Sequence, residues 1–357
     1  LISKDAGEPN YADFSSAFIE LKDRKGHFKV ILGDYINQWG QGLVQSGSFS
    51  LGKSYESIRA TQKFHGGALA YTSSGESEFY RGINLQSNFR KFQGQLYFSS
   101  RKKDLILVKD QNYFRAFQLD GLHRTPTEIG QLNKLHEIAA GANLRYVGKH
   151  VDVAFAQTWT KWNYRFQPSN PLDWQGDLLV NSSLSYIRQQ ENIRLSGEVA
   201  YTANSAWAMI QAMSWAIDKK TDLSAIIRVF EAGYFSPMAN AISESSNNKN
   251  EWGLYIGHQY QRNKYQRFSS YLDIFRFPKA SSSHWAAEKI GWEFLSRFQW
   301  DRRKLGHYFA QVKWTHKYLY SRNHGLIAQN LYQASIDWNR PLRKLDWHGR
   351  IMWSHLQ

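Results

Sequence analysis

The chain has 357 residues, no cysteine and a formal net charge of +15. The absence of cysteine excludes disulfide bonds and thiolate metal sites. Aromatic residues make up 15% of the chain, yet the mean hydropathy is −0.57 and no run of about 18 apolar residues occurs, which excludes membrane-spanning helices. An aromatic-rich chain that is hydrophilic on average is typical of a transmembrane β-barrel, because half of each strand faces water.

The dominant pattern is an alternation of apolar and polar residues that returns every ten to fifteen residues. Residues 193–202 show it well, because the odd positions are mostly apolar and the even positions are polar or small. Successive side chains of a strand point to opposite faces, so one face suits lipid and the other suits water. Soluble sandwiches, propellers and lectins alternate too. The few prolines, strands of about ten residues and aromatic residues at strand ends favour the membrane barrel.

The first elements predicted are a hairpin and a long insertion. Residues 14–22 and 27–34 form the hairpin, and the glycine-rich, small and polar stretch that continues to Ser54 predicts a long loop or an insertion into the lumen. In the strand expected at 78–90, carboxamide residues share one face, which suits a wet lumen. Strands are expected in this part of the chain near residues 66–73, 78–90, 92–100 and 112–118.

Residues 121–140 break the β pattern and predict a helical loop insertion. Thr125 is an N-cap residue, Pro126 occupies the first helical position and Glu128 completes a capping box, while Gly141 ends the segment. One helical face would carry the apolar residues Ile129, Leu132, Leu135 and Ile138. A single short amphipathic helix in a β chain is expected to be a loop or plug element.

Strands dominate the remainder of the chain, for a total of about 18. Short turns such as 219–220 alternate with long loops at 163–178, 233–250 and 278–286, and short turns are expected on the periplasmic rim. We therefore predict one all-β domain over residues 1–357, an outer-membrane β-barrel of 16 to 20 antiparallel strands. The start at Leu1 and the end without a terminal aromatic residue suggest that an N-terminal segment and closing strands are missing. The later strands are expected near 142–148, 151–163, 180–189, 192–203, 206–217, 221–231, 251–262, 265–277, 287–299, 306–319, 325–337 and 345–355.

Charged residues within the strands are candidates for the lumen. Inward basic side chains would give a lumen that favours anions. Alternatively, they balance inward acids such as Glu198 and Asp152. Asp152 and Asp273 fit either ion pairs with inward cations, which we prefer, or titratable gates. The sequence contains no phosphate loop, H-E-x-x-H motif or nucleophile elbow, so we expect neither an enzyme nor a cofactor or metal. The lumen candidates are Arg145, Lys149, Arg188, Arg194, Glu198 and Arg228.

Three stretches carry a family resemblance. They are Gly33-Asp34-Tyr35 with Gly40-Gln41-Gly42-Leu43, His123-Arg124-Thr125 with Glu128, and Trp252-Gly253-Leu254-Tyr255. Together they resemble the barrel part of large Bacteroidota envelope proteins, in which an N-terminal segment with competence-type helix-hairpin-helix repeats precedes the barrel. The resemblance implies contact with DNA through that segment, which is not among these residues. It assigns Gly33, Gly40 and Gly42 to a backbone bend, and His123, Arg124, Thr125 and Glu128 to a capped loop helix. Asp34 is a further structural residue of the first motif.

Two functions follow as hypotheses, and an outer-membrane enzyme is a weaker third. The first is a channel or translocation pore for DNA or anionic solutes. The second is a non-catalytic scaffold or accessory subunit of a complex for secretion, assembly or nutrient import. The expected partners are the lipid bilayer, lipopolysaccharide and other envelope proteins, with DNA expected from the resemblance alone.

Overall fold

A computed structural model shows a nearly all-β protein in which one sheet contains 19 strands. The all-β fold and the strand number predicted from the sequence are confirmed. The predicted loop at 278–286 falls largely outside the described residues. The structure describes residues 1–11, 13–47, 52–63, 66–108, 112–118, 121–203, 206–245, 248–280, 288–302, 306–321, 325–342 and 345–357.

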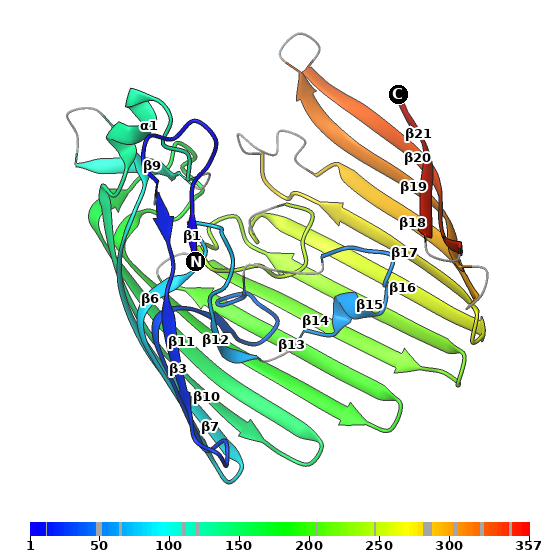
Figure 1. Cartoon of the computed structure of the whole chain (residues 1–357), viewed down its shortest axis with the longest axis horizontal. Helices are drawn as coiled ribbons and strands as arrows, with labels where there is room; N and C mark the ends of the chain where they lie inside the picture. Colours follow the sequence, from blue (N-terminus) through cyan, green and yellow to red (C-terminus); the bar gives the residue numbers. More distant parts are fainter. Residues whose placement is uncertain are drawn as a thin grey trace.

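Long antiparallel strands form a curved wall (Figure 1). Small elements lie in its connections: β1 (Ile2–Ser3), β2 (Phe14–Ser15), η1 (Arg59–Thr61), β5 (Gly67–Ala70), β8 (Leu105–Leu107), β9 (Tyr113–Phe117) and α1 (Pro126–Gln131). The wall strands are β3 (Phe18–Lys22), β4 (Phe28–Gln38), β6 (Tyr80–Phe89), β7 (Phe92–Lys103), β10 (Leu135–Val147), β11 (Val151–Phe166), β12 (Gly176–Gln190), β13 (Ile193–Thr202), β14 (Ala206–Ala216), β15 (Thr221–Phe230), β16 (Glu251–Asn263), β17 (Gln266–Arg276), β18 (Ile290–Arg302), β19 (Gly306–Ser321), β20 (Gly325–Leu342) and β21 (Leu345–Leu356).

The wall is a meander in which nearly every strand pairs with the next one along the chain. From β10 to β21 each pair is consecutive and antiparallel. Earlier, β4 pairs with β6 and β7 pairs with β10, so the β8–β9 hairpin stands outside the ladder, although β9 runs parallel to the end of β11. Figure 1 shows β3 in blue on one side of the curved wall and β21 in red on the other.

The two rims of the wall differ in the length of their connections. Short turns at 90–91, 148–150, 191–192, 217–220 and 264–265 join strands at one rim. Long connections lie at the opposite rim, at 39–79, 104–134, 167–175 and 231–250. This asymmetry confirms the alternation of short turns and long loops predicted from the sequence, and it is the arrangement expected of outer-membrane barrels.

The wall has an apolar outer face and a polar inner face. Directly paired residues point to the same side of a sheet. Leu184 pairs with Val199, and both are exposed on the convex side, at 57% and 49%. Ser185 pairs with Glu198, and both are buried on the concave side. The outer face carries exposed apolar side chains along its whole width, among them Leu96, Phe98, Leu144, Val153, Phe155, Ile227, Ile256, Ile274, Phe294, Val312 and Ile336.

The inner face also carries the carboxamide row expected in residues 78–90. Asn84 is buried and donates to Asn37 at 2.8 Å, and Gln95 on the next strand donates to the same Asn37 oxygen at 2.7 Å. Ile83, which precedes Asn84 in the sequence, is exposed on the outer face. The alternation therefore separates these side chains as predicted.

The predicted helix at 121–140 is wrong in its extent. Its capping box is present, because Thr125 and Glu128 cap each other's backbone N–H groups, but α1 ends at Gln131 and buries no residue. Asn133 turns the chain with a φ of +57°, and Leu135 begins strand β10. In β10 the backbone N–H and C=O groups form hydrogen bonds with both β7 and β11. These ladder hydrogen bonds stabilise a strand here more than the helical spacing of the apolar residues stabilises a helix. Among the described residues, no helix has the length and apolar content needed to cross a bilayer.

The two faces predict different responses to an added charge. Leu184→Arg places a cation on the outer face, and we expect it to lower the free energy of unfolding in lipid vesicles by about 2–4 kcal/mol. Ser335→Arg on the inner face is the control and should cost far less, because its side chain meets water. Urea unfolding in vesicles measures both, and equal losses for the two variants would contradict the assignment of the faces.

Candidate functional site: the loop-lined lumen

Two long connections fold into the hollow of the wall. The first, which we name the lumen loop, is described at residues 39–47 and 52–63; the second spans 231–250. Figure 1 shows the blue lumen loop crossing in front of β12 to β15. Trp39 and Leu43 of the lumen loop are fully buried, and Trp39 Nε1 donates to Gln95 on the inner face at 2.8 Å. The lumen insertion predicted for this glycine-rich segment is therefore confirmed.

A buried carboxylate holds the start of the lumen loop. The backbone N–H groups of Gln41 and Leu43 donate to Glu198 Oε2 at 2.7 and 3.1 Å. Gly40 and Gly42 have φ values of +53° and +87°, which favour glycine. A Cβ atom at Gly40 would lie 2.6 Å from the Glu198 carboxyl group. The turn aims successive amides at one anion, so these glycines and Glu198 form one structural unit.

The two inserted loops also bind each other. Tyr234 donates its hydroxyl to the Leu43 carbonyl at 2.7 Å, and Asn240 N donates to the Gly42 carbonyl at 2.9 Å. Ser46 N donates to the Met238 carbonyl at 2.9 Å. Around these bonds, Leu43 and residues of the inner face form one apolar cluster, so both loops pack on the wall as a single layer.

A network of buried charges ties both loops to the wall. Arg228 on β15 donates to Glu251 at 2.5 Å and, through two nitrogens, to Asp273 at 2.7 and 2.9 Å. Lys53 of the lumen loop donates to the same Asp273 at 2.8 Å and also contacts Glu244 of the second loop. Lys317 contacts Glu244 as well, which balances the three carboxylates with three cations. The Glu251 carboxylate further accepts the backbone N–H groups of residues 244 and 245.

The lumen residues predicted from the sequence divide into three groups. Glu198 and Arg228 lie at the loop anchors. Arg145 points inward and pairs with Asp152 at 2.5 Å, while Arg194 is half-buried on the inner face, and its Nε has no hydrogen-bond partner among the described residues.

The remaining two lumen predictions are wrong. Lys149 is exposed in the 148–150 turn, because β10 ends at Val147. Arg188 pairs with Leu195 and Val151, whose side chains belong to the outer face, and it is exposed there. Alternate side chains of a strand point to the same face. Arg188 lies four residues after Leu184, which points outward, so Arg188 points outward as well.

Several inward cations are paired with acids. Lys103 pairs with Glu137 at 2.7 Å, Lys313 pairs with Glu293 at 3.0 Å, and Arg350 pairs with Asp337. The balancing role for Arg145 and Arg228, and the ion-pair role for Asp152 and Asp273, are therefore confirmed. Lys53, Glu244 and Glu251 are not predictable from the sequence, because their partners lie in other elements and no spacing along the chain signals them.

The other motif residues have structural positions near the long-loop rim. Gly33 has a φ of +102°, and a Cβ atom there would lie 2.2 Å from the Ala17 carbonyl oxygen. Asp34 is buried, accepts the Ala17 N–H at 3.2 Å and binds Arg81 through both oxygens at 2.7 and 2.9 Å. Arg124 is exposed, 3.8 Å from Glu128 of the capping box.

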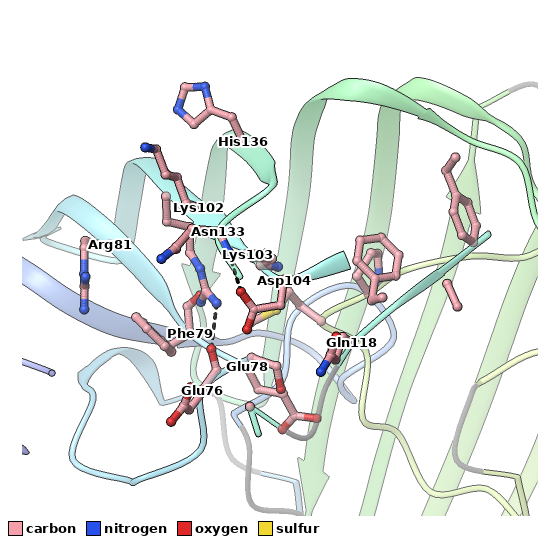
Figure 2. Close-up of a pocket in the computed structure, with 18 of the residues that line it drawn as sticks. Glu76, Glu78, Phe79, Arg81, Lys102, Lys103, Asp104, Gln118, Asn133 and His136 are labelled. Atoms are coloured by element: carbon pink, nitrogen blue, oxygen red, sulfur yellow. Dashed lines mark hydrogen bonds between the residues drawn. The ribbon is translucent and has the colours of Figure 1, made fainter. Parts of the chain in front are cut away.

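A cavity of about 880 Å³ opens at the same rim. Figure 2 shows Glu76, Phe79, Lys103 and Asp104 around it. Arg101, another lining residue, lies over the Phe79 ring at 4.0 Å and donates to the Glu76 carbonyl at 2.8 Å. Burial, and next the charge of nearby carboxylates, raise the pKa of Glu76 to about 7. The cavity thus combines aromatic faces with charges of both signs.

Comparisons with known proteins give only distant structural similarity. No protein-family model and no curated protein match the chain. OccAB3 of Acinetobacter baumannii is 10% identical, with coverage of 92% of this chain and 81% of that chain and a TM-score of 0.41. OpdQ of Pseudomonas aeruginosa is 10% identical over 76% of both chains, with a TM-score of 0.40. A BenF-like porin from Pseudomonas fluorescens Pf-5 is 8% identical over 92% of this chain and 81% of its own, with a TM-score of 0.40. At this level no function is transferred.

The Glu198 anchor predicts that Gly40 tolerates no side chain. We expect Gly40→Ala to release the lumen loop, because the methyl group meets the Glu198 carboxyl group and the positive φ costs about 1 kcal/mol more. Gly26→Ala is the matched control, since Gly26 has a φ of +71° but nothing within 4 Å of the added carbon. Limited trypsin digestion should cut the loop at Lys53 or Arg59 faster in Gly40→Ala alone. Equal cutting in both variants would disprove the anchor.

The buried network predicts a large cost for removing its central cation. Arg228→Met leaves Glu251 and Asp273 without their main partner, and we expect a loss of about 3–5 kcal/mol in the free energy of unfolding. Arg188→Met removes an exposed cation and should change stability by less than about 0.5 kcal/mol. Urea denaturation of the two variants in the same vesicles provides the comparison, and similar stabilities would refute the network.

Proposed function

We propose that this chain forms the wall of a bacterial outer-membrane channel whose lumen is narrowed by the two inserted loops. The observation that carries the proposal is the exposed apolar side chains across the whole outer face, opposite a polar and charged inner face. An apolar face of this width costs free energy in water and is stable against hydrocarbon. By the usual orientation the short turns are periplasmic, so the long-loop rim meets the outer leaflet with its lipopolysaccharide.

Small polar solutes fit this lumen better than a polyanion. Pairing with an acid, as between Arg228 and Asp273, removes the positive field of that cation, which a long anionic chain would need. Arg194 is a half-buried cation of the inner face, and its Nε lacks a hydrogen-bond partner among the described residues. We therefore propose passage of small solutes with a modest preference for anions, and the family resemblance keeps DNA as the second cargo to test.

A scaffold is the second candidate function, and the inserted loops favour it. Trp39 and Leu43 of the lumen loop are fully buried between this loop and the inner face, so this part of the lumen is filled. A filled lumen would leave the barrel as an anchor for loops that bind other envelope proteins. The two functions differ in conductance, which the scaffold lacks.

Ion selectivity tests the channel. We expect Arg194→Glu in the native protein to shift the reversal potential in a salt gradient towards cations, because the new carboxylate faces the lumen. Arg188→Glu makes the same charge change on the outer face and should leave the reversal potential unchanged. Planar bilayer recordings of both variants provide the measurement. Absence of conductance in the wild-type protein would favour the scaffold, and equal shifts would contradict the inner position of Arg194.

A further inference from the structure

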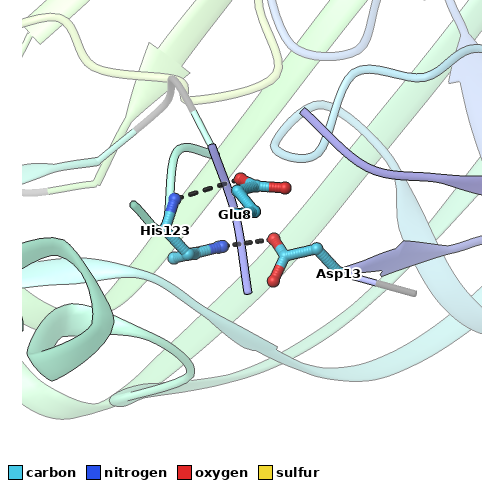
Figure 3. Close-up of side chains that lie close together, drawn as sticks. All are labelled: Glu8, Asp13 and His123. Carbon is cyan, nitrogen blue, oxygen red and sulfur yellow. Dashed lines mark hydrogen bonds and ion pairs between the residues drawn. The ribbon is translucent and has the colours of Figure 1, made fainter. Parts of the chain in front are cut away.

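A buried histidine joins three separate segments beside the large cavity. His123 Nδ1 contacts Asp13 of the N-terminal segment, and Nε2 lies 3.0 Å from Asp104, which follows β7. Glu8 accepts the backbone N–H of His123 at 3.1 Å. His123 and Glu8 are 2% and 4% exposed. Figure 3 shows the Glu8 carboxylate facing the backbone N–H of His123 and the Asp13 carboxylate facing its imidazole ring.

Negative charge is in excess at this place. Glu8, Asp13, Asp104 and Glu76 surround one imidazole, and within the described part of the chain every ion pair of these carboxylates is made with His123. A single imidazolium neutralises only one of them. Buried carboxylates without a cation are costly, so the cluster has a place for a further positive charge.

The donor atoms match a metal site in type and spacing. One oxygen from Glu8, one from Asp13 and a ring nitrogen of His123 lie within 4.8 Å of one another. Asp104 holds the opposite ring nitrogen, which is the usual arrangement behind a metal-bound histidine. A histidine with two carboxylates suits a divalent first-row transition ion better than Ca²⁺ or Mg²⁺, which prefer oxygen ligands alone.

We propose that Glu8, Asp13 and His123 bind a divalent transition-metal ion such as Zn²⁺, with Asp104 as the residue that positions His123. Asp13 and His123 also line the 880 Å³ cavity, so the ion can be reached from it and keeps a coordination position for water or a cavity ligand. The ion would tie the N-terminal segment to the loop before α1. This site is separate from the loop anchors in the lumen.

Metal content and affinity test the site. The native protein, purified in detergent and stripped with EDTA, is titrated with Zn²⁺ against a chromophoric chelator, and bound metal is counted by mass spectrometry. We expect one tightly bound Zn²⁺ per chain in the wild type and none in Asp13→Asn or His123→Gln. Asp173→Asn is the control, because Asp173 lines the same cavity but pairs with Lys249 at 2.7 Å. Far-UV circular dichroism checks that each variant is folded.

Asp104 provides a second measurement that does not depend on losing the site. Asp104→Asn should keep one metal per chain while its affinity falls by about 10–100-fold. With Co²⁺ as the probe, its visible absorption band should shift in Asp104→Asn and vanish in His123→Gln. No stoichiometric Zn²⁺ in the wild type, or equal Zn²⁺ in all variants, would overturn the proposal and leave His123 as an imidazolium held between two aspartates.

Discussion

Charge pairing beneath the inserted loops is the constraint on which the interior depends. The inner face of the wall is charged, and the loops that fold onto it remove much of its water. A charge that loses its water must find an opposite charge or several hydrogen bonds. Arg228 meets this demand with Glu251 and Asp273, and Lys53 brings the lumen loop to the same aspartate. The position of the loops and the pairing of the wall charges therefore depend on each other.

The buried carboxylate of Glu198 is stabilised by hydrogen bonds. It accepts backbone N–H groups from the lumen loop, which only a turn containing Gly40 and Gly42 can present. The glycine motif noted in the sequence thus has its physical reason in a carboxylate about 155 residues away along the chain. Such a contact holds the loop through its backbone N–H groups, which suits a narrow passage as well as it suits a rigid anchor.

The long-loop rim holds a different kind of chemistry. There the carboxylates around His123 exceed the cations, whereas beneath the loops the charges balance. An ion bound at His123 would fix the N-terminal segment beside the cavity and alter what the cavity accepts. The lumen and the long-loop rim would then have separate functions. The lumen would serve for passage or as an anchor, and the rim would serve for metal-dependent recognition.

The sequence by itself determined the all-β fold, most of the strand positions and the alternation of an apolar with a polar face, because a two-residue repeat is local and needs no partner. It also identified the capping box at Thr125, the inward Asp152 and Asp273, and the lumen insertion. Only the tertiary structure decided that α1 ends at Gln131, because residues from Leu135 onwards pair with β7 and β11 as a strand. It also decided the partners of Arg228 and Glu198 and brought Glu8, Asp13 and His123 together. These contacts join segments that are far apart in the sequence, and no sequence pattern indicates that they are close in space.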